Sequence, residues 1–96
     1  MRIEFDEEKG KRNRAKHGLS LGFAGRLDWT AMLARVDDRQ NYGEERWVGV
    51  APQGGRLYAV VFTLGEDETV RVISLRRATN REIERYERQG RKQAKF

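Results

Sequence analysis

Cysteine is absent from this 96-residue chain, and histidine occurs only once. Without cysteine there is no disulfide framework, no thiolate metal site and no thiol nucleophile. The chain has a single histidine and no carboxylate cluster at metal-ligand spacing, so it shows no set of residues that would bind a metal ion. We therefore expect no metal and no other cofactor.

Long apolar runs are also missing. No stretch approaches the about 18 apolar residues that a membrane-spanning helix needs, and residues 1–6 lack the apolar core of a signal peptide. We expect a cytoplasmic protein that has no membrane partner. Internal repeats and low-complexity linkers are absent too, so the length predicts one domain over residues 1–90 and a basic tail at 91–96.

Positive charge is what the chain has in excess. Lys and Arg total 20 against 15 Asp and Glu, a net charge of +5, and fifteen of the cations are arginine. Arginine favours planar, bidentate partners such as phosphate or carboxylate. The cations gather at residues 9–16 and 85–95. This pattern favours RNA, DNA or an acidic protein as partner, although a charged, solvated surface has the same composition.

Alternation and capping residues predict the element order β-α-α-β-β-β-β-α. In the first half we expect a strand at 2–5, a helix at 7–17 between Asp6 and Gly18, a short helix at 21–27 opened by Ser20, and a strand at 31–36. Residues 37–43 read as a polar turn. In the second half we expect strands at 44–51, 56–64 and 70–77, joined by turns at 52–55 and 65–68. A final helix should start after Thr79 and end at Gly90. Short turns between these strands favour an antiparallel meander sheet with helices packed on it, an α+β fold.

The first helix should carry four polar side chains on one face. Lys9, Asn13, Lys16 and His17 follow i, i+4, i+7, i+8 spacing and therefore lie together. Asparagine is a poor residue for a helix interior, so its use here suggests a specific hydrogen bond. The alternative is an exposed polar face without a function.

The last strand and the following helix combine arginines with a helix start. Simple alternation places Arg71 and Arg77 on one strand face and Arg76 on the other, so all three would meet one phosphate only if the strand twists or bulges. Thr79 and Glu82 match a capping box. A basic strand end beside a helix start can hold a phosphate.

Three segments of the chain form an ordered set of motifs. They are Phe5-Asp6, Lys9, Asn13, Lys16-His17-Gly18 and Ser20; then Asp38-Arg39, Tyr42-Gly43-Glu44 and Arg46; then Arg71 to Ala78, Thr79, Glu82 and Tyr86. Together these segments resemble the BrnT family of bacterial toxins. Leu21, Gly22 and Leu75 depart from the residues usual in the family, and these departures concern packing more than chemistry.

The resemblance implies a toxin of a type II toxin–antitoxin system with a RelE-like α+β fold. It also implies a ribonuclease activity that inhibits translation. The partners would be RNA and a small, BrnA-like antitoxin with a ribbon-helix-helix part, encoded beside the toxin. Such complexes usually repress their own operon, so operator DNA would be reached only through the antitoxin complex.

Metal-free RNA cleavage needs a group that removes the 2′-hydroxyl proton, a group that protonates the leaving 5′-oxygen, and cations around the pentacoordinate phosphorus. His17 is a candidate acid or base because the unperturbed pKa of histidine is about 6.5. A histidine at a helix end more often bonds to the last carbonyls. Lys16 either contacts phosphate and adjusts the charge state of its neighbour, or stays on the solvated surface.

Further candidates lie on the predicted strands and the last helix. Glu44 and Arg46 lie two residues apart on one predicted strand face, where they form either a base with a phosphate clamp or a structural cross-strand ion pair. The predicted catalytic residues are therefore His17, Lys16, Glu44, Arg46 and Arg77. Replacing Arg77 or Arg46 by Ala should abolish toxicity. The predicted RNA-binding residues are Lys9, Arg71, Arg76 and Tyr86, with Tyr86 alternatively part of the core. A non-catalytic nucleic-acid-binding or protein-interaction module is the rival function.

Overall fold

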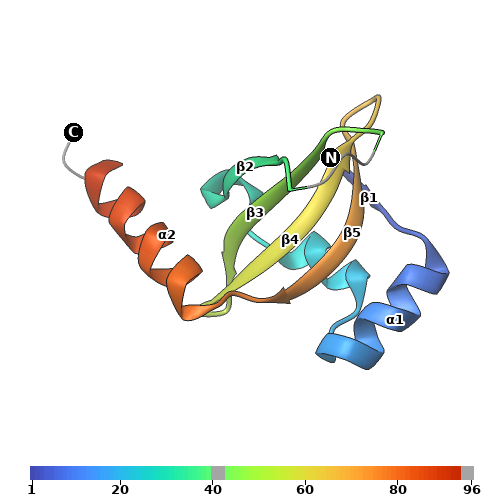
Figure 1. Cartoon of the computed structure of the whole chain (residues 1–96), viewed down its shortest axis with the longest axis horizontal. Helices are drawn as coiled ribbons and strands as arrows, with labels where there is room; N and C mark the ends of the chain where they lie inside the picture. The colour runs from blue at the N-terminus through green and yellow to red at the C-terminus, as the bar shows by residue number, and fades with distance from the viewer. Residues whose placement is uncertain (40–42, 94–96) are drawn as a thin grey trace.

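A five-stranded sheet with helices at both ends makes up the protein (Figure 1). The computed structural model describes residues 1–39 and 43–93, with side chains up to residue 90. The elements are β1 (Arg2–Glu4), α1 (Glu7–His17), the 3₁₀ helices η1 (Leu21–Arg26) and η2 (Trp29–Ala31), β2 (Leu33–Asp37), β3 (Arg46–Gln53), β4 (Arg56–Leu64), β5 (Thr69–Arg77) and α2 (Asn80–Gln93). The strand order is β1-β5-β4-β3-β2. This confirms the predicted α+β fold.

Strand β1 departs from the predicted antiparallel pattern. It pairs in parallel with β5, Ile3 opposite Val70, whereas all other neighbouring strands run antiparallel. A parallel pair needs a long crossover connection, and here everything from α1 to β4 lies between the two strands. No local pattern in residues 2–5 could indicate that partner.

Helix α1 begins and ends where its capping residues predict. The Asp6 carboxylate accepts a hydrogen bond from the Lys9 amide at 3.0 Å, and Glu7 and Glu8 lie in the first turn. Gly18 adopts a left-handed conformation, φ 73°, and its amide donates to the carbonyl of Arg14. Glycine adopts this conformation without the Cβ clash that other residues meet.

Helix α2 has the predicted start but not the predicted end. The Glu82 amide donates to Thr79 Oγ1 at 3.2 Å, and the Thr79 amide donates to Glu82 Oε1 at 2.8 Å, so the capping box is confirmed. The helix continues through Gly90 to Gln93. A glycine inside a helix costs only about 1 kcal/mol relative to alanine, which is not enough to stop it. Part of the predicted tail is therefore helical, and residues 94–96 lie outside the described residues.

Several predicted boundaries shift by a few residues. The second helix forms as the 3₁₀ helix η1, with the Ser20 hydroxyl accepting from the Gly22 amide as predicted. Strand β2 begins at Leu33 because η2 precedes it, and β3 begins at Arg46, so Glu44 lies before the strand. The β3–β4 turn contains Gly54 and Gly55, both at positive φ, as a tight two-residue hairpin turn requires. The predicted 37–43 turn falls partly on residues 40–42, which lie outside the described residues.

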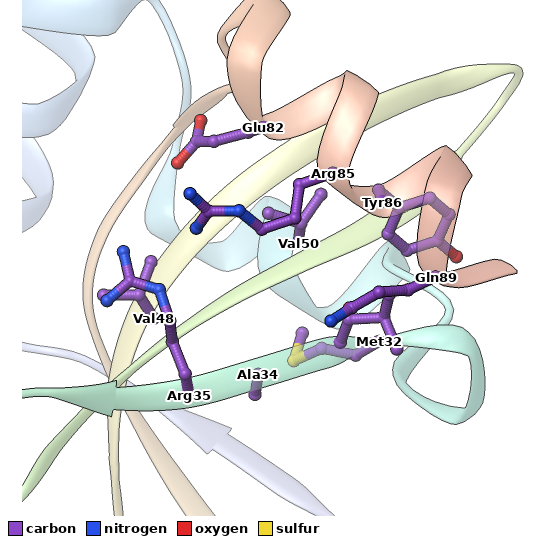
Figure 2. Close-up of a pocket in the computed structure, with 10 residues that line it drawn as sticks. Met32, Ala34, Arg35, Val48, Val50, Glu82, Arg85, Tyr86 and Gln89 are labelled. Carbon is purple, nitrogen blue, oxygen red and sulfur yellow. The ribbon is translucent and has the colours of Figure 1, made fainter. Parts of the chain in front are cut away.

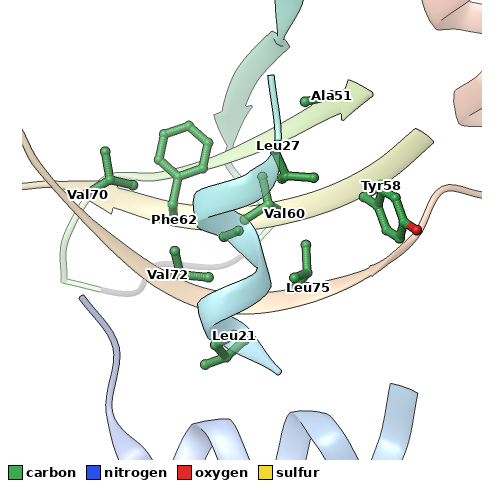
Figure 3. Close-up of a cluster of buried hydrophobic side chains, with 10 residues drawn as sticks. Leu21, Leu27, Ala51, Tyr58, Val60, Phe62, Val70, Val72 and Leu75 are labelled. Carbon is green, nitrogen blue, oxygen red and sulfur yellow. The ribbon is translucent and has the colours of Figure 1, made fainter. Parts of the chain in front are cut away.

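The main core lies on one face of the sheet, under η1 (Figure 3). Its fully buried large side chains are Leu21 from η1, Val60 from β4, and Val72 and Leu75 from β5. Two of these, Leu21 and Leu75, are the departures from the family pattern, and both are completely enclosed in the same cluster. Neither α-helix among the described residues is long and apolar enough to span a membrane.

A bulge in β5 changes which residues share a face. Phe62 pairs with Val72 but Val61 pairs with Ser74, so Ile73 is the extra residue. Val70, Val72 and Leu75 consequently all point to the core. The predicted grouping of Arg71 with Arg77 is wrong, because simple alternation cannot include the extra residue. Arg77 lies on the core face opposite Tyr58, whereas Arg71 and Arg76 lie on the other face.

This other face, called here the outer face, carries two adjacent rows of side chains. Val48, Val61 and Ser74 are paired across β3, β4 and β5 in one row. Val50, Ala59 and Arg76 form the next row. Helices α1 and α2 lie at opposite ends of the sheet in Figure 1, and each borders a hollow on the outer face.

Candidate functional site

The first hollow, the α1 depression, lies between α1 and the outer face. Its volume is about 420 Å³. It is lined by Lys9, Arg12, Asn13, Lys16, His17, Arg46, Ile73 and Ser74. The four polar residues that helical spacing grouped on α1 therefore do lie together, and the bulge of β5 with Arg46 of β3 forms the facing wall.

Asn13 attaches α1 to the bulged strand. Its side-chain amide donates to the carbonyls of Leu19 and Leu75, each at 2.9 Å, and its Oδ1 accepts from the Leu75 amide at 3.0 Å. The side chain is buried, with 6% exposed. Because β1 pairs with β5 only at residues 69–71, Asn13 satisfies backbone groups at Leu75 that a neighbouring strand would otherwise satisfy. The hydrogen bond predicted for this asparagine is confirmed.

Charge in the α1 depression is positive. No carboxylate occurs among the lining residues that the structure describes. Lys9, Arg12 and Lys16 take part in no ion pair within residues 1–39 and 43–93. The His17 imidazole is half-buried and has no hydrogen-bond partner in the same part of the chain. Cations left available beside an imidazole are suited to binding a phosphate group.

Arg46 is the contribution of β3 to this depression. Its side chain is largely enclosed, and its Nε lies 3.7 Å from Glu44 Oε1. Strand pairing also sets it opposite Asp37, whose carboxylate is bound by Arg39 at 2.7 Å. Glu44 reaches Arg46 from the segment before the strand, so the predicted shared strand face is wrong, and the ion pair is a local contact, not the cross-strand pair considered as the alternative.

The remaining predicted residues lie outside the α1 depression. Arg71 is on the outer face and pairs with Glu4 at 3.4 Å. Arg76 binds both carboxylate oxygens of Glu82, at 2.7 and 3.1 Å. Arg77 is exposed on the opposite face of the sheet. Tyr86 donates its hydroxyl to the Ala31 carbonyl at 2.7 Å. The structure thus brings Lys9, Lys16, His17 and Arg46 together and leaves the other candidates apart.

Two pKa shifts belong to the α2 end of the sheet. Hydrogen bonds from Arg76 lower the pKa of the Glu82 carboxyl, against the opposing effect of partial burial. Partial burial raises the pKa of the Tyr86 hydroxyl, with a smaller contribution from the charge of Asp28. Both groups therefore keep their ordinary charge states near neutral pH, Glu82 as a carboxylate and Tyr86 as a phenol.

The second hollow, the α2 cleft, lies between α2 and strands β2 and β3 (Figure 2). Its volume is about 350 Å³. The lining residues are Met32, Leu33, Ala34, Arg35, Val48, Val50, Glu82, Arg85, Tyr86 and Gln89. Among the residues that the structure describes, neither hollow contains a group of three or more His, Asp or Glu side chains placed to hold a metal ion.

Comparison with known proteins identifies the family. Residues 5–82 match a family described as "Ribonuclease toxin, BrnT, of type II toxin-antitoxin system". The chain belongs to the BrnT family. The structure is also similar to the crystal structure of the Brucella abortus ribonuclease toxin BrnT, with 34% identity and a TM-score of 0.60, over 83% of this chain and 99% of the other. No curated protein matches the chain. The resemblance inferred from the sequence is confirmed, and the protein is a member of a ribonuclease toxin family.

Sequence reasoning missed three residues of the α1 depression, Arg12, Ile73 and Ser74. Arg12 is adjacent to Asn13 and three residues from Lys9 on the helix, so helical spacing could have included it. Simple alternation would place Ser74 on the face of Val70 and Val72, and only the bulge moves it to the outer face. No signal in the strand's own sequence reports that extra residue.

Proposed function

We propose that the α1 depression is the ribonuclease site of this toxin. The observation that carries the proposal is the convergence of Lys9, Lys16 and His17 from α1 with Arg46 from β3 at one polar hollow. An imidazole among several cations supplies both proton transfer and charge stabilisation, the requirements of phosphodiester cleavage. The protein's own cations provide the positive charge, so we propose a metal-independent reaction.

In the proposed reaction, His17 accepts the proton of an RNA 2′-hydroxyl, and the 2′-oxygen attacks the adjacent phosphorus. The bond between phosphorus and the 5′-oxygen then breaks, and the Lys16 ammonium donates a proton to that leaving oxygen. The products are a 2′,3′-cyclic phosphate and a 5′-hydroxyl, and solvent restores both protonation states. Lys9 and Arg46 stabilise the charge on the non-bridging oxygens. Glu44, 3.7 Å from Arg46, orients the guanidinium.

Membership of a type II toxin–antitoxin family supports the cellular role that we propose. Cleavage of RNA inhibits translation in the cytoplasm. A cognate ribbon-helix-helix antitoxin neutralises the toxin, and the complex, not the toxin alone, contacts operator DNA. Arg71 and Arg76, on the same outer face of β5 as Ser74, extend the contact with the RNA backbone.

The test is cleavage of a single-stranded RNA by the purified protein in excess EDTA, with end-group analysis of the products. We expect cyclic phosphate and 5′-hydroxyl ends from the wild type. His17→Gln should lower the cleavage rate by about 10²–10⁴-fold, the usual contribution of a general acid or base. Lys11→Ala, on the solvent side of the same helix, is the control and should cleave normally.

Two results would contradict the proposal. A folded wild type that binds RNA without cleaving it would be a nucleic-acid-binding module. Cleavage that stops in EDTA and returns with a divalent cation would exclude the metal-independent reaction. Induction in cells, with and without the antitoxin gene, checks that cleavage and growth arrest occur together.

A further inference from the structure

The α2 cleft differs chemically from the α1 depression. Its floor on the sheet consists of aliphatic side chains, Leu33, Val48 and Val50. At its rim, Arg35 and Arg85 are exposed and take part in no ion pair among the described residues. The lining carboxylate of Glu82 is already bound by Arg76 and by the Thr79 amide. The cleft thus has an apolar floor and a positively charged rim.

Helix α2 has little contact with the body of the protein along this cleft. It is held near its start by the Arg76–Glu82 pair and one turn further on by the hydroxyl of Tyr86 on the Ala31 carbonyl. Beyond that point it extends away from the sheet (Figure 1). Arg85 and Gln89 project from α2 toward the strands, and Arg35 rises from β2 on the facing side (Figure 2). A helix whose inner stripe is incompletely covered is suited to pairing with a second helix.

We propose that the α2 cleft is the docking site of an amphipathic helix of the antitoxin. Aliphatic side chains of that helix enter the cleft onto Val48 and Val50, and acidic side chains beside them meet Arg35 and Arg85. Charge complementarity of this kind sets the partner and the orientation of an interface. This inference rests on the proposed function, because it takes the antitoxin as the protein partner.

A helix fits the cleft better than an added strand. A helix lying along α2 covers the inner stripe of α2 and the aliphatic floor at the same time. A strand added to the free edge of β2 would pair with that strand's backbone and leave Arg85 and Gln89 uncovered. RNA fits less well, because an aliphatic floor offers single-stranded bases no aromatic surface on which to stack. The one aromatic side chain in this cleft, Tyr86, is fixed to Ala31.

The position of the cleft explains how docking there would stop RNA cleavage. Arg46, in the α1 depression, is two residues before Val48 on the same strand face. Val48 in turn lies in one row with Val61 and Ser74, and Ser74 lines the depression. A stable interface covers about 800 Å² on each partner, which is more than one such cleft offers. The bound antitoxin therefore extends along the outer face over the RNA site.

The test measures binding of purified toxin to the purified antitoxin from the same operon by isothermal titration calorimetry. Arg85→Glu reverses a rim charge, and Val50→Asp places a carboxylate on the apolar floor. Each substitution should raise the dissociation constant by about tenfold or more, as loss of an interface anchor does. Arg88→Glu makes the same charge reversal on α2 outside the cleft and should bind like the wild type. In cells, the first two variants should arrest growth even when the antitoxin is present.

Wild-type affinity in both cleft variants would overturn the inference, as would a loss of RNA affinity without any loss of antitoxin affinity. Circular dichroism of Val50→Asp checks its fold, and the exposed position of Arg85 keeps the test valid if that variant misfolds. Failure of the wild type to cleave RNA would refute the proposed ribonuclease site, whereas the calorimetric comparison would still decide the docking site.

Discussion

Asn13→Ala is the most informative perturbation of the fold, because one side chain joins α1 to β5. The substitution removes two hydrogen bonds to Leu75 and one to the Leu19 carbonyl. It also leaves the Leu75 amide and carbonyl without a partner at a residue that is 0% exposed. Helix α1 offers few apolar contacts as a substitute, since Asn13 is its one buried residue.

The expected loss of stability can be worked from these groups. A buried donor or acceptor left without a partner costs about 1–3 kcal/mol, and a part-buried hydrogen bond contributes about 1 kcal/mol. Two groups at Leu75 and one at Leu19 together give about 3–7 kcal/mol. This is a large share of the about 5–15 kcal/mol by which domains are stable.

Urea unfolding followed by the fluorescence of Trp29 and Trp47 measures this loss. With a slope of about 1–2 kcal/mol per molar for a small domain, the midpoint should fall by about 1.5 M or more. Asn13→Asp should be at least as destabilising, because its carboxylate would face the carbonyls of Leu19 and Leu75. Lys11→Ala on the exposed side of α1 should change stability by less than about 0.5 kcal/mol. A loss below about 1 kcal/mol for Asn13→Ala would refute the role assigned to this side chain.

Two other perturbations test the packing and the α2 start. A Cβ at Gly49 would overlap the Met32 sulfur, so Gly49→Ala should lower the free energy of unfolding by about 1–3 kcal/mol in chemical denaturation. In a double-mutant cycle, Met32→Ala should relieve most of that cost. Equal losses with and without Met32→Ala would contradict the overlap. The Arg76–Glu82 pair lowers the pKa of Glu82 in the folded protein. The pair therefore stabilises the fold fully above the pKa of about 4.3 that glutamate has in the unfolded chain. This stabilisation is lost as the pH falls through the still lower pKa of the folded state. Glu82→Gln should lose at most about 1 kcal/mol at pH 7, given solvent screening, and the difference from wild type should vanish in acid; a difference that persists at pH 2 would contradict this origin.

Local chemistry made much of the fold predictable. Three predicted features each depend on residues within a few positions of one another, so the sequence alone was sufficient to predict them. They are the caps at Asp6 and Gly18, the capping box of Thr79 and Glu82, and the turn at Gly54 and Gly55. Helical spacing likewise grouped Lys9, Lys16 and His17 correctly.

Features that depend on distant residues were not predictable in the same way. Asn13 and Leu75 are 62 positions apart, so the asparagine signalled a hydrogen bond without naming its partner. The bulge at Ile73 arises from pairing with β4 and reverses the faces of every later residue of β5. Glu44 and Arg46 were predicted to share a strand face, but the strand begins after Glu44, so the two residues instead form a local ion pair.

A comparison of Arg46→Ala with Arg77→Ala tests the central claim most directly. Both arginines were predicted to be catalytic, but they lie on opposite faces of the sheet, and only Arg46 lines the α1 depression. The measurement is the single-turnover rate of RNA cleavage in EDTA for each folded variant. If the outer face holds the ribonuclease site, Arg46→Ala should lose about 10²-fold or more in rate, and Arg77→Ala should cleave nearly as fast as the wild type. Normal cleavage by Arg46→Ala together with an inactive Arg77→Ala would contradict the claim and move the site to the other face.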